Sequence, residues 1–215
     1  DMHELMAKMS LLKPDQEPKA TQHIEQILSL TEKLISSGHA YKTEQGNVYF
    51  RVSSFPEYGK LSKRKVDSAI EGTRVEYEQD KESNLDFALW KRSDPPNWSS
   101  TYGAGRPGWH IECSAMIESC VKGPIDLHGG GNDLKFPHHE NEIAQSCCAF
   151  NHEFVKLWMH IGFVLLNGEK MSKSTGNFIP LRKLLTEEPS DVLRYYMYST
   201  HYRSPLNFTT EGLKS

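Results

Sequence analysis

Two features of the sequence predict an α/β fold. Residues 125–150 combine a short apolar strand, three consecutive glycines and a helix whose first turn suits Pro137. Strand, glycine loop and helix N-terminus form the unit with which α/β folds hold a phosphate at the carboxyl ends of parallel strands. The apolar run "LWMHIGFVLL", residues 157–166, follows the strand pattern as well.

A helix and a group of short strands are predicted before this unit. Residues 21–37 form a helical pattern that ends at Gly38, a natural C-terminal cap. Five apolar side chains share one face of this helix: Ile24, Ile27, Leu28, Leu34 and Ile35. The runs "GNVYFRV", "TRVEYE" and "DFALW" then alternate between turn-forming segments, which predicts a small antiparallel unit over about 41–100. The turn-rich residues 93–108 close it.

Composition limits the classes of function. The 215 residues are 37% hydrophobic with no run near the ~18 apolar residues of a membrane span, so no bilayer segment is expected. The four cysteines show no CxxC spacing, which favours a reducing, cytoplasmic compartment. The net charge of −3 gives no overall attraction to nucleic acid, so an RNA contact requires a local basic patch.

One basic cluster offers such a patch. Lys60, Lys63, Arg64 and Lys65 lie in "KLSKRKV", inside the predicted antiparallel unit. A solvated charged face is the default interpretation of such a cluster, and contact with an RNA backbone is the alternative.

Three residues have the chemistry of metal ligands. His138 and Glu142 are four apart on the predicted helix, so their side chains share one face. Cys113 opens an earlier helical segment. Cysteine, histidine and glutamate all bind zinc, and three protein ligands with an open position are typical of a working metal. Taken alone, Cys113 also fits a small buried hydrophobe, and the HxxxE pair fits an ordinary helix surface.

In order along the chain, "GRPGWHIECSAM", "DLHGGGNDLKFPHHENEIAQS" and "EKMSKSTGNF" resemble the catalytic core of the cysteinyl-tRNA synthetases, a class I family. The resemblance covers nearly all of the chain. It implies a zinc ion on Cys113, His138 and Glu142, with an earlier family cysteine that has no counterpart here. The family's HIGH motif is expected upstream of the residues present here. The similar residues His160–Phe163 ("HIGF") are not this motif, because they lie in a strand pattern just before the KMSKS segment.

The resemblance implies four segments. Residues 1–40 end the first half of a Rossmann-like nucleotide-binding core, and residues 41–105 form a connective insertion. Residues 106–190 form the second half of the core with the KMSKS loop, and residues 191–215 start a helical region. Because the chain begins at Asp1 inside a helical pattern, we expect an internal piece of a longer protein that is inactive alone.

The implied activity is ATP-dependent ligation of L-cysteine to tRNA(Cys). A pocket separates cysteine from serine or alanine by only ~1–3 kcal/mol through shape, whereas zinc binds a thiolate and not a hydroxyl. Trp109, His110 and His128 are expected to wall the amino-acid pocket; ordinary packing is the alternative for each.

The polar, glycine-flanked segment after residue 166 is explained by the same activity. Attack on the α-phosphate of ATP accumulates negative charge, and we expect Lys170 and Lys173 to compensate it from a mobile loop. Ser172 is expected to bind ATP beside Lys173. Gly129, Gly130 and Asp133 are expected to bind the adenosine side, and magnesium to accompany the triphosphate.

Two other functions remain open from the sequence. A related ligase activates cysteine in the same way but transfers it to a sugar amine in mycothiol synthesis. A catalytically inactive zinc- or RNA-binding relative is the second, although such a module has no need of the second KMSKS lysine.

Overall fold

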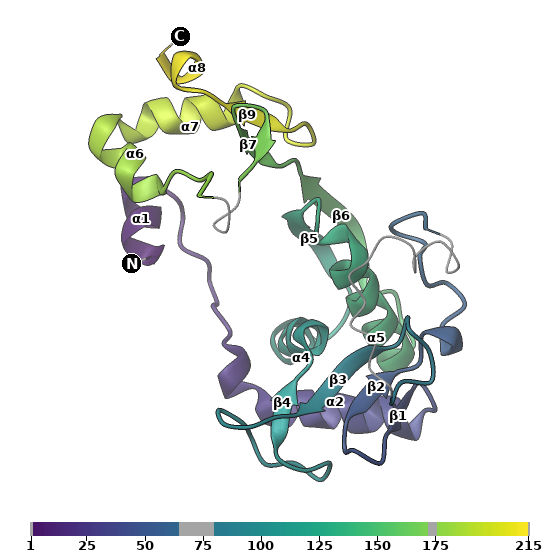
Figure 1. The fold of residues 1–215 in the computed structure, drawn as a ribbon. Coiled ribbons are helices and arrows are strands. Elements are labelled where there is room, and N and C mark those ends of the chain that lie inside the picture. The colour runs from purple at the N-terminus through teal and green to yellow at the C-terminus, as the bar shows by residue number, and fades with distance from the viewer. Residues whose placement is uncertain (1, 65–79, 172–175, 215) are drawn as a thin grey trace. The chain divides into compact units, whose positions relative to one another are not determined.

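The computed structural model describes residues 2–64, 80–171 and 176–214 (Figure 1). Compactness divides the chain into two units. The central unit comprises Pro18–His128 and Asp133–Trp158, and the terminal unit comprises Asp1–Glu17, Gly129–Asn132 and Met159–Ser215. The predicted strand 73–78, Lys65, Ser172 and Lys173 lie outside the described residues.

The central unit is built on a four-stranded antiparallel sheet in the order β1-β2-β3-β4 (Figure 1). Its strands are β1 (Ala40–Lys42), β2 (Val48–Phe50), β3 (Phe87–Arg92) and β4 (Gly105–Pro107). The short 3-10 turn η1 (Ala20–Gln22) precedes the first helix of this unit, and the 3-10 turn η2 (Val52–Ser54) follows β2. All three residues of β2 are fully buried, and Phe50 stacks on Phe87 with ring centroids 4.9 Å apart. Antiparallel pairing is confirmed for two of the three predicted strands, those that become β2 and β3.

Two helices pack against this sheet and each other. The helix α2 (Ile24–Ser36) buries Ile27 and Leu34 completely, and Gly38, whose φ is +81°, follows its C-cap Ser37. The helix α4 (Trp109–Val121) contributes Ile111 and Ala115 to the same core. Both helices therefore follow the apolar periodicity of the sequence, because the buried positions recur at helical spacing.

The glycines of residues 129–131 form part of a strand and not, as predicted, a loop after it. The strand β5 (Ile125–Gly131) includes all three, and none has a positive φ. The amide of Ile125 donates to the Phe154 carbonyl (3.0 Å) and that of Asn132 to Ile161 (2.8 Å), so β6 (Val155–Ile161) runs parallel to β5. Pairing with β6 thus keeps the glycines extended. His160 and Ile161 lie in β6, as the strand pattern predicted.

The helix predicted from Pro137 begins later. The turn η3 (Lys135–His139) contains Phe136 in an extended conformation (φ −142°, ψ 131°), and only at Glu140 does α5 (Glu140–Phe150) begin. His138 therefore lies on the turn that leads into α5, whereas Glu142 lies in the first turn of α5 itself.

The terminal unit has its own small core of Met9, Leu193, Phe208 and Leu213. A three-stranded sheet in the order β8-β7-β9 supplies part of it. The elements of this unit are α1 (Met2–Lys8), β7 (Val164–Leu166), β8 (Glu169–Lys170), α6 (Leu181–Glu187), α7 (Ser190–Tyr198), β9 (Leu206–Phe208) and α8 (Thr210–Lys214). The sequence indicated a helical pattern at the N-terminus and a helical region over 191–215, but neither α6 nor β9, which pairs in parallel with β7.

Lys170 lies on a strand and not, as predicted, on a loop. Asn167 and Gly168 have φ values of +51° and +84°, and they join β7 to β8 as a two-residue hairpin. Asparagine followed by glycine is the strongest short-range signal for such a turn, because both residues tolerate positive φ. The segment therefore continues the sheet through Lys170.

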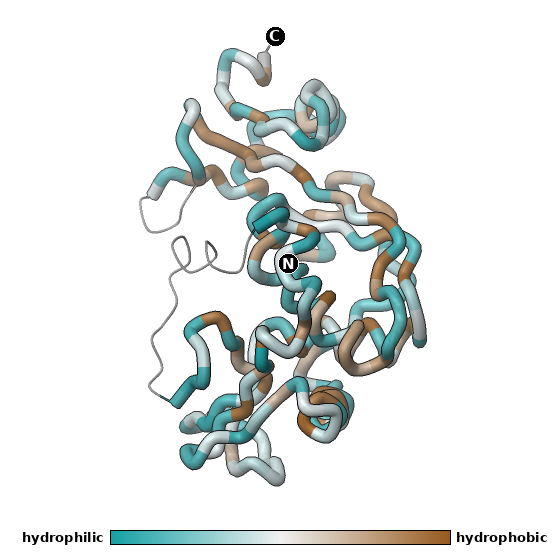
Figure 2. The backbone as a smooth tube through the Cα atoms, turned by 90° about the vertical axis from the view of Figure 1, so that its right-hand side faces the viewer, coloured by the Kyte–Doolittle hydropathy of each residue, from teal (hydrophilic) through white to brown (hydrophobic). Residues whose placement is uncertain are grey.

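No described helix is long and apolar enough to cross a membrane. Apolar residues alternate with hydrophilic ones along the chain (Figure 2).

The start of α4 depends on a glycine. A Cβ atom on Gly108 would lie 1.8 Å from the carbonyl oxygen of Ala88, although the φ of −67° suits any residue. We expect Gly108→Ala to lower the free energy of unfolding by about 3 kcal/mol, through steric overlap alone. Urea denaturation followed by circular dichroism measures this.

Gly38→Ala is the matched control. Gly38 has a positive φ but no atom within 4 Å of the added Cβ, so its cost is backbone strain of about 1 kcal/mol. Equal effects of the two substitutions would contradict a tight contact between α4 and β3.

Candidate functional site

Three elements of the central unit bring Cys113, His138 and Glu142 together. Cys113 lies on α4, His138 on η3 and Glu142 on α5, and their ligand atoms all lie within 4.8 Å of one another. The His138 Nε2 atom is 2.7 Å from Glu142 Oε1. The sequence placed His138 and Glu142 on one face of a predicted helix but could not show that Cys113 lies beside them. The structure shows that it does.

The charge on Glu142 is poorly compensated by the protein alone. Its side chain is 1% exposed, and Oε2 accepts no hydrogen bond from the described residues. The His128 Nε2 atom lies 3.4 Å from that oxygen, close enough for a weak ionic contact if the ring is protonated. A buried carboxylate without donors is costly, because nothing replaces its hydration. This oxygen therefore fits a cation bound beside it.

The thiol of Cys113 fits the same cation. Burial, and secondarily the nearby Glu142 and Glu112 carboxylates, raise the pKa of Cys113 to about 12. A thiol in this environment stays protonated at neutral pH, whereas coordination to a dication deprotonates it. The donor set of sulfur, imidazole nitrogen and carboxylate oxygen is one that zinc accepts.

His110 holds the ring of His138 from the other side. Their Nδ1 atoms are 2.8 Å apart, so one nitrogen donates to the other, while His138 Nε2 faces Glu142. Burial, followed by the charge of His138, lowers the pKa of His110 to about 3, so this imidazole is neutral. A histidine ligand generally has such an outer partner, which fixes its ring orientation. His110 therefore contacts a candidate ligand, and its predicted place in the amino-acid pocket stays a prediction.

Trp109 lies against the same histidine. Its ring centroid is 4.4 Å from that of His138, yet the residue is 57% exposed. An indole with one face on His138 and the remainder open is suited to contact a small molecule that binds at this site. Its position agrees with the predicted pocket wall, which stays a prediction.

A second set of ligand atoms shares Glu142. His128, His139 and Glu142 also have ligand atoms within 4.8 Å of one another. His128 and His139 pack on Trp158, with ring centroids 4.8 Å and 4.9 Å away. Sequence reasoning missed His139, although the HH pair at 138–139 was a signal. Of the two sets, only the first contains the sulfur ligand that distinguishes zinc from hard cations.

A buried hydrogen bond joins the two ligand-bearing helices. Ser114 Oγ, on α4, donates to Gln145 Oε1, on α5, at 2.6 Å, and both residues are buried. Ser114 directly follows Cys113, so this bond fixes the thiol relative to α5. Neither residue was predicted, because a serine and a glutamine carry no signal until their helices are known to meet.

The predicted ATP-binding residues are distributed over both units. Gly129 and Gly130 lie on β5 and belong to the terminal unit, as does Lys170, whose exposed Nζ lies 4.6 Å from the Phe163 ring centroid. Asp133 is exposed just after β5, in the central unit. Their roles stay predictions, as do those of Ser172 and Lys173 outside the described residues.

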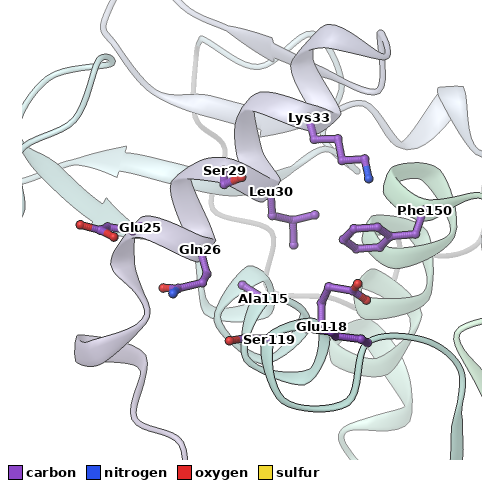
Figure 3. Close-up of a pocket in the computed structure, with 10 residues that line it drawn as sticks. Glu25, Gln26, Ser29, Leu30, Lys33, Ala115, Glu118, Ser119 and Phe150 are labelled. Atoms are coloured by element: carbon purple, nitrogen blue, oxygen red, sulfur yellow. The ribbon is translucent and has the colours of Figure 1, made fainter.

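A separate cavity of about 560 Å³ lies between α2 and α4, with Phe150 of α5 at one end (Figure 3). Lys33 points toward the Phe150 ring, 4.0 Å from its centroid. None of the predicted site residues lines this cavity. On α4 its wall is Ala115, Glu118 and Ser119, and Ala115 is two residues, or about 200° of helical rotation, from Cys113.

A family model for the catalytic domain of the class I (C) tRNA synthetases matches residues 1–215. The chain belongs to this family. The resemblance drawn from the three motifs is thereby confirmed.

Curated relatives agree with this assignment. A cysteine–tRNA ligase of Marinobacter nauticus is 52% identical to this chain over 99% of the chain, and the match spans 46% of that protein. A cysteine–tRNA ligase of Solidesulfovibrio magneticus is 55% identical over 98% of the chain, which spans 44% of it. The chain thus spans about half the length of the relatives that it matches.

Solved structures of class I synthetases share the fold. Methionyl-tRNA synthetase of Mycobacterium tuberculosis, in complex with methionyl-adenylate, has a TM-score of 0.72 at 15% identity, over 99% of this chain and 53% of that one. A putative arginyl-tRNA synthetase of Campylobacter jejuni has a TM-score of 0.59 at 15% identity, over 99% of this chain and 39% of that one. The predicted α/β, Rossmann-like fold is confirmed.

Proposed function

We propose that the protein to which this chain belongs is a cysteine–tRNA ligase that selects cysteine through a zinc ion. The convergence of Cys113, His138 and Glu142 carries this proposal, and the relatives that match the whole chain support it. ATP, L-cysteine and tRNA(Cys) are its substrates, with magnesium on the triphosphate. The four cysteines are free, which agrees with a cytoplasmic location.

Selection of cysteine begins at the three ligand residues. A bound zinc ion supplies a site that holds the thiolate of the substrate and rejects the hydroxyl of serine. Glu142 and Cys113 supply the negative charge that retains the ion, and His110 orients the His138 ring through their 2.8 Å contact. Trp109 contacts His138, and His128 lies beside Glu142, so both are placed to wall a pocket at the ligands.

Activation is attack of a cysteine carboxylate oxygen on the α-phosphorus of ATP. The bond from that phosphorus to the β-phosphate oxygen breaks, and pyrophosphate leaves. Lys170 and Lys173 stabilise the negative charge that accumulates on the triphosphate, while Gly129, Gly130 and Asp133 hold the adenosine. A terminal ribose hydroxyl of the tRNA then attacks the carbonyl carbon of the adenylate, and AMP leaves.

The alternative function differs only in the second step of the reaction, in which a sugar amine and not tRNA accepts the cysteine. The relatives that match the whole chain are named as tRNA ligases, and this favours tRNA. Incubation of the full-length protein with labelled cysteine, ATP and either acceptor decides between them, because only the true acceptor becomes acylated.

Replacement of Cys113 tests the metal site. We expect Cys113→Ser in the full-length protein to lose the zinc, about one ion per chain, together with the preference for cysteine over serine. Elemental analysis and amino-acid-dependent pyrophosphate exchange measure the two effects. Cys120→Ser is the control, because Cys120 is exposed on the same helix. Zinc and cysteine selectivity intact in Cys113→Ser would refute the assignment.

The second signature lysine is expected to act on the transition state. Lys173→Ala should slow adenylate formation ~100-fold or more and leave cysteine binding nearly unchanged. Pyrophosphate exchange and equilibrium binding of cysteine separate these effects. Lys183→Ala, at an exposed position of α6, serves as the control. A normal exchange rate in Lys173→Ala would remove this lysine from the mechanism.

The basic cluster provides a third test. Lys60, Lys63 and Arg64 are exposed, and Lys65 lies outside the described residues. If they contact the tRNA backbone, reversing the charges of Lys60 and Lys63, which leaves the Arg64–Phe136 contact in place, weakens tRNA binding and lowers its salt slope by about one per lost contact, without changing adenylate formation. Reversal of two exposed lysines elsewhere, Lys19 and Lys122, controls for net charge. If the variant and the wild-type protein bound tRNA equally well across a salt series, the cluster would be only a solvated charged face.

A further inference from the structure

Glu140 is a buried carboxylate between two of the candidate ligands. It has no exposed surface and lies in the first turn of α5, two residues from both His138 and Glu142. Its Oε1 atom accepts the backbone N–H groups of Gly59 (2.9 Å) and Leu61 (3.3 Å), and Oε2 accepts that of Ser62 (2.8 Å). Three backbone donors thus bind one buried side chain.

The same loop contacts the ligand-bearing turn at two more places. The Tyr58 hydroxyl donates to Asn141 Oδ1, next to Glu140. The Arg64 guanidinium lies 4.6 Å from the ring centroid of Phe136, two residues before His138. Residues 58–64, here called the anchoring loop, therefore hold the chain on both sides of His138 and immediately before Glu142.

The geometry of a helix separates this anchor from the metal set. Residues two apart on an α-helix differ by about 200°, so Glu140 and Glu142 project to opposite sides of α5. The anchoring loop can therefore bind Glu140 while Glu142 faces Cys113 and His138. The loop fixes the turn from behind, and no ligand atom takes part.

We propose that Glu140 is a positioning residue for the metal site, which holds the turn of His138 and Glu142 in ligand geometry by binding the anchoring loop. This inference rests on the proposed zinc site. Glu140 touches neither the ligand atoms nor the substrate, so it acts through the backbone that carries both ligands.

Glu140→Gln tests this role with little change of shape. The amide keeps one acceptor oxygen, but its NH₂ group must face at least one backbone N–H group, so the loop loses part of its anchor. In the full-length protein we expect zinc to bind about 10-fold more weakly, as measured by competition with a chelator. We also expect the visible absorption bands of the Co²⁺-substituted protein to shift, because they report ligand geometry. If Glu140→Gln does not fold, zinc affinity and the Co²⁺ spectrum are measured for Glu140→Asp, which keeps the carboxyl group on a shorter side chain.

Asp86→Asn is the matched control. Asp86 is 2% exposed and also accepts backbone N–H groups, those of Val52 (2.9 Å) and Ser83 (3.2 Å), in addition to the Tyr41 hydroxyl (2.8 Å). We expect this variant to lose stability but to keep the zinc affinity and the Co²⁺ spectrum. Unchanged affinity and spectrum in Glu140→Gln would show that Glu140 serves stability alone. A wild-type protein that binds neither metal would instead overturn the zinc site, and this proposal with it.

Discussion

The buried carboxylate of Glu142 is the constraint on which the centre depends. A charge with 1% exposure must be compensated inside the protein, and His138 contacts only one of its oxygens closely, at 2.7 Å. Burial lowers the pKa of His128, whose Nε2 atom lies 3.4 Å from the other oxygen, so this imidazole is a poor source of positive charge. We propose that a dication held by Glu142, His138 and Cys113 supplies the missing charge.

The neighbouring architecture serves this requirement. Gly108 lets the start of α4 approach Ala88 closely, which places Trp109 and His110 beside the turn η3. The Ser114–Gln145 bond then joins α4 to α5 next to the thiol. We propose that selection of a sulfur atom by coordination is the reason why buried polar groups meet here, since a pocket that selected by shape alone would be apolar.

Local periodicity predicted much of this fold. The helix α2 followed from apolar residues at helical spacing, and β2 and β3 followed from short alternating runs. Local signals failed where a distant partner decides the conformation. The three glycines are extended because they pair with β6. The Asn167–Gly168 hairpin that contains Lys170 is different, because its signal was local and the prediction overlooked it.

The site was predictable in its ligand types and not in its supports. Cys113, His138 and Glu142 stood out because few side chains bind zinc, and the motifs ordered them. Glu140 gave no comparable signal, because a glutamate on a helix is usually exposed. Its role depends on burial and on backbone donors from residues 59–62, about eighty positions earlier in the chain.

X-ray absorption at the zinc edge of the full-length protein tests the central claim most directly, because it counts the sulfur atoms bound to the ion. Spectra are compared without an amino acid, with L-cysteine and with L-serine. The proposed mechanism predicts one additional zinc–sulfur contact of about 2.3 Å with cysteine and no change with serine. A sulfur count that stays the same when cysteine binds would contradict selection by coordination.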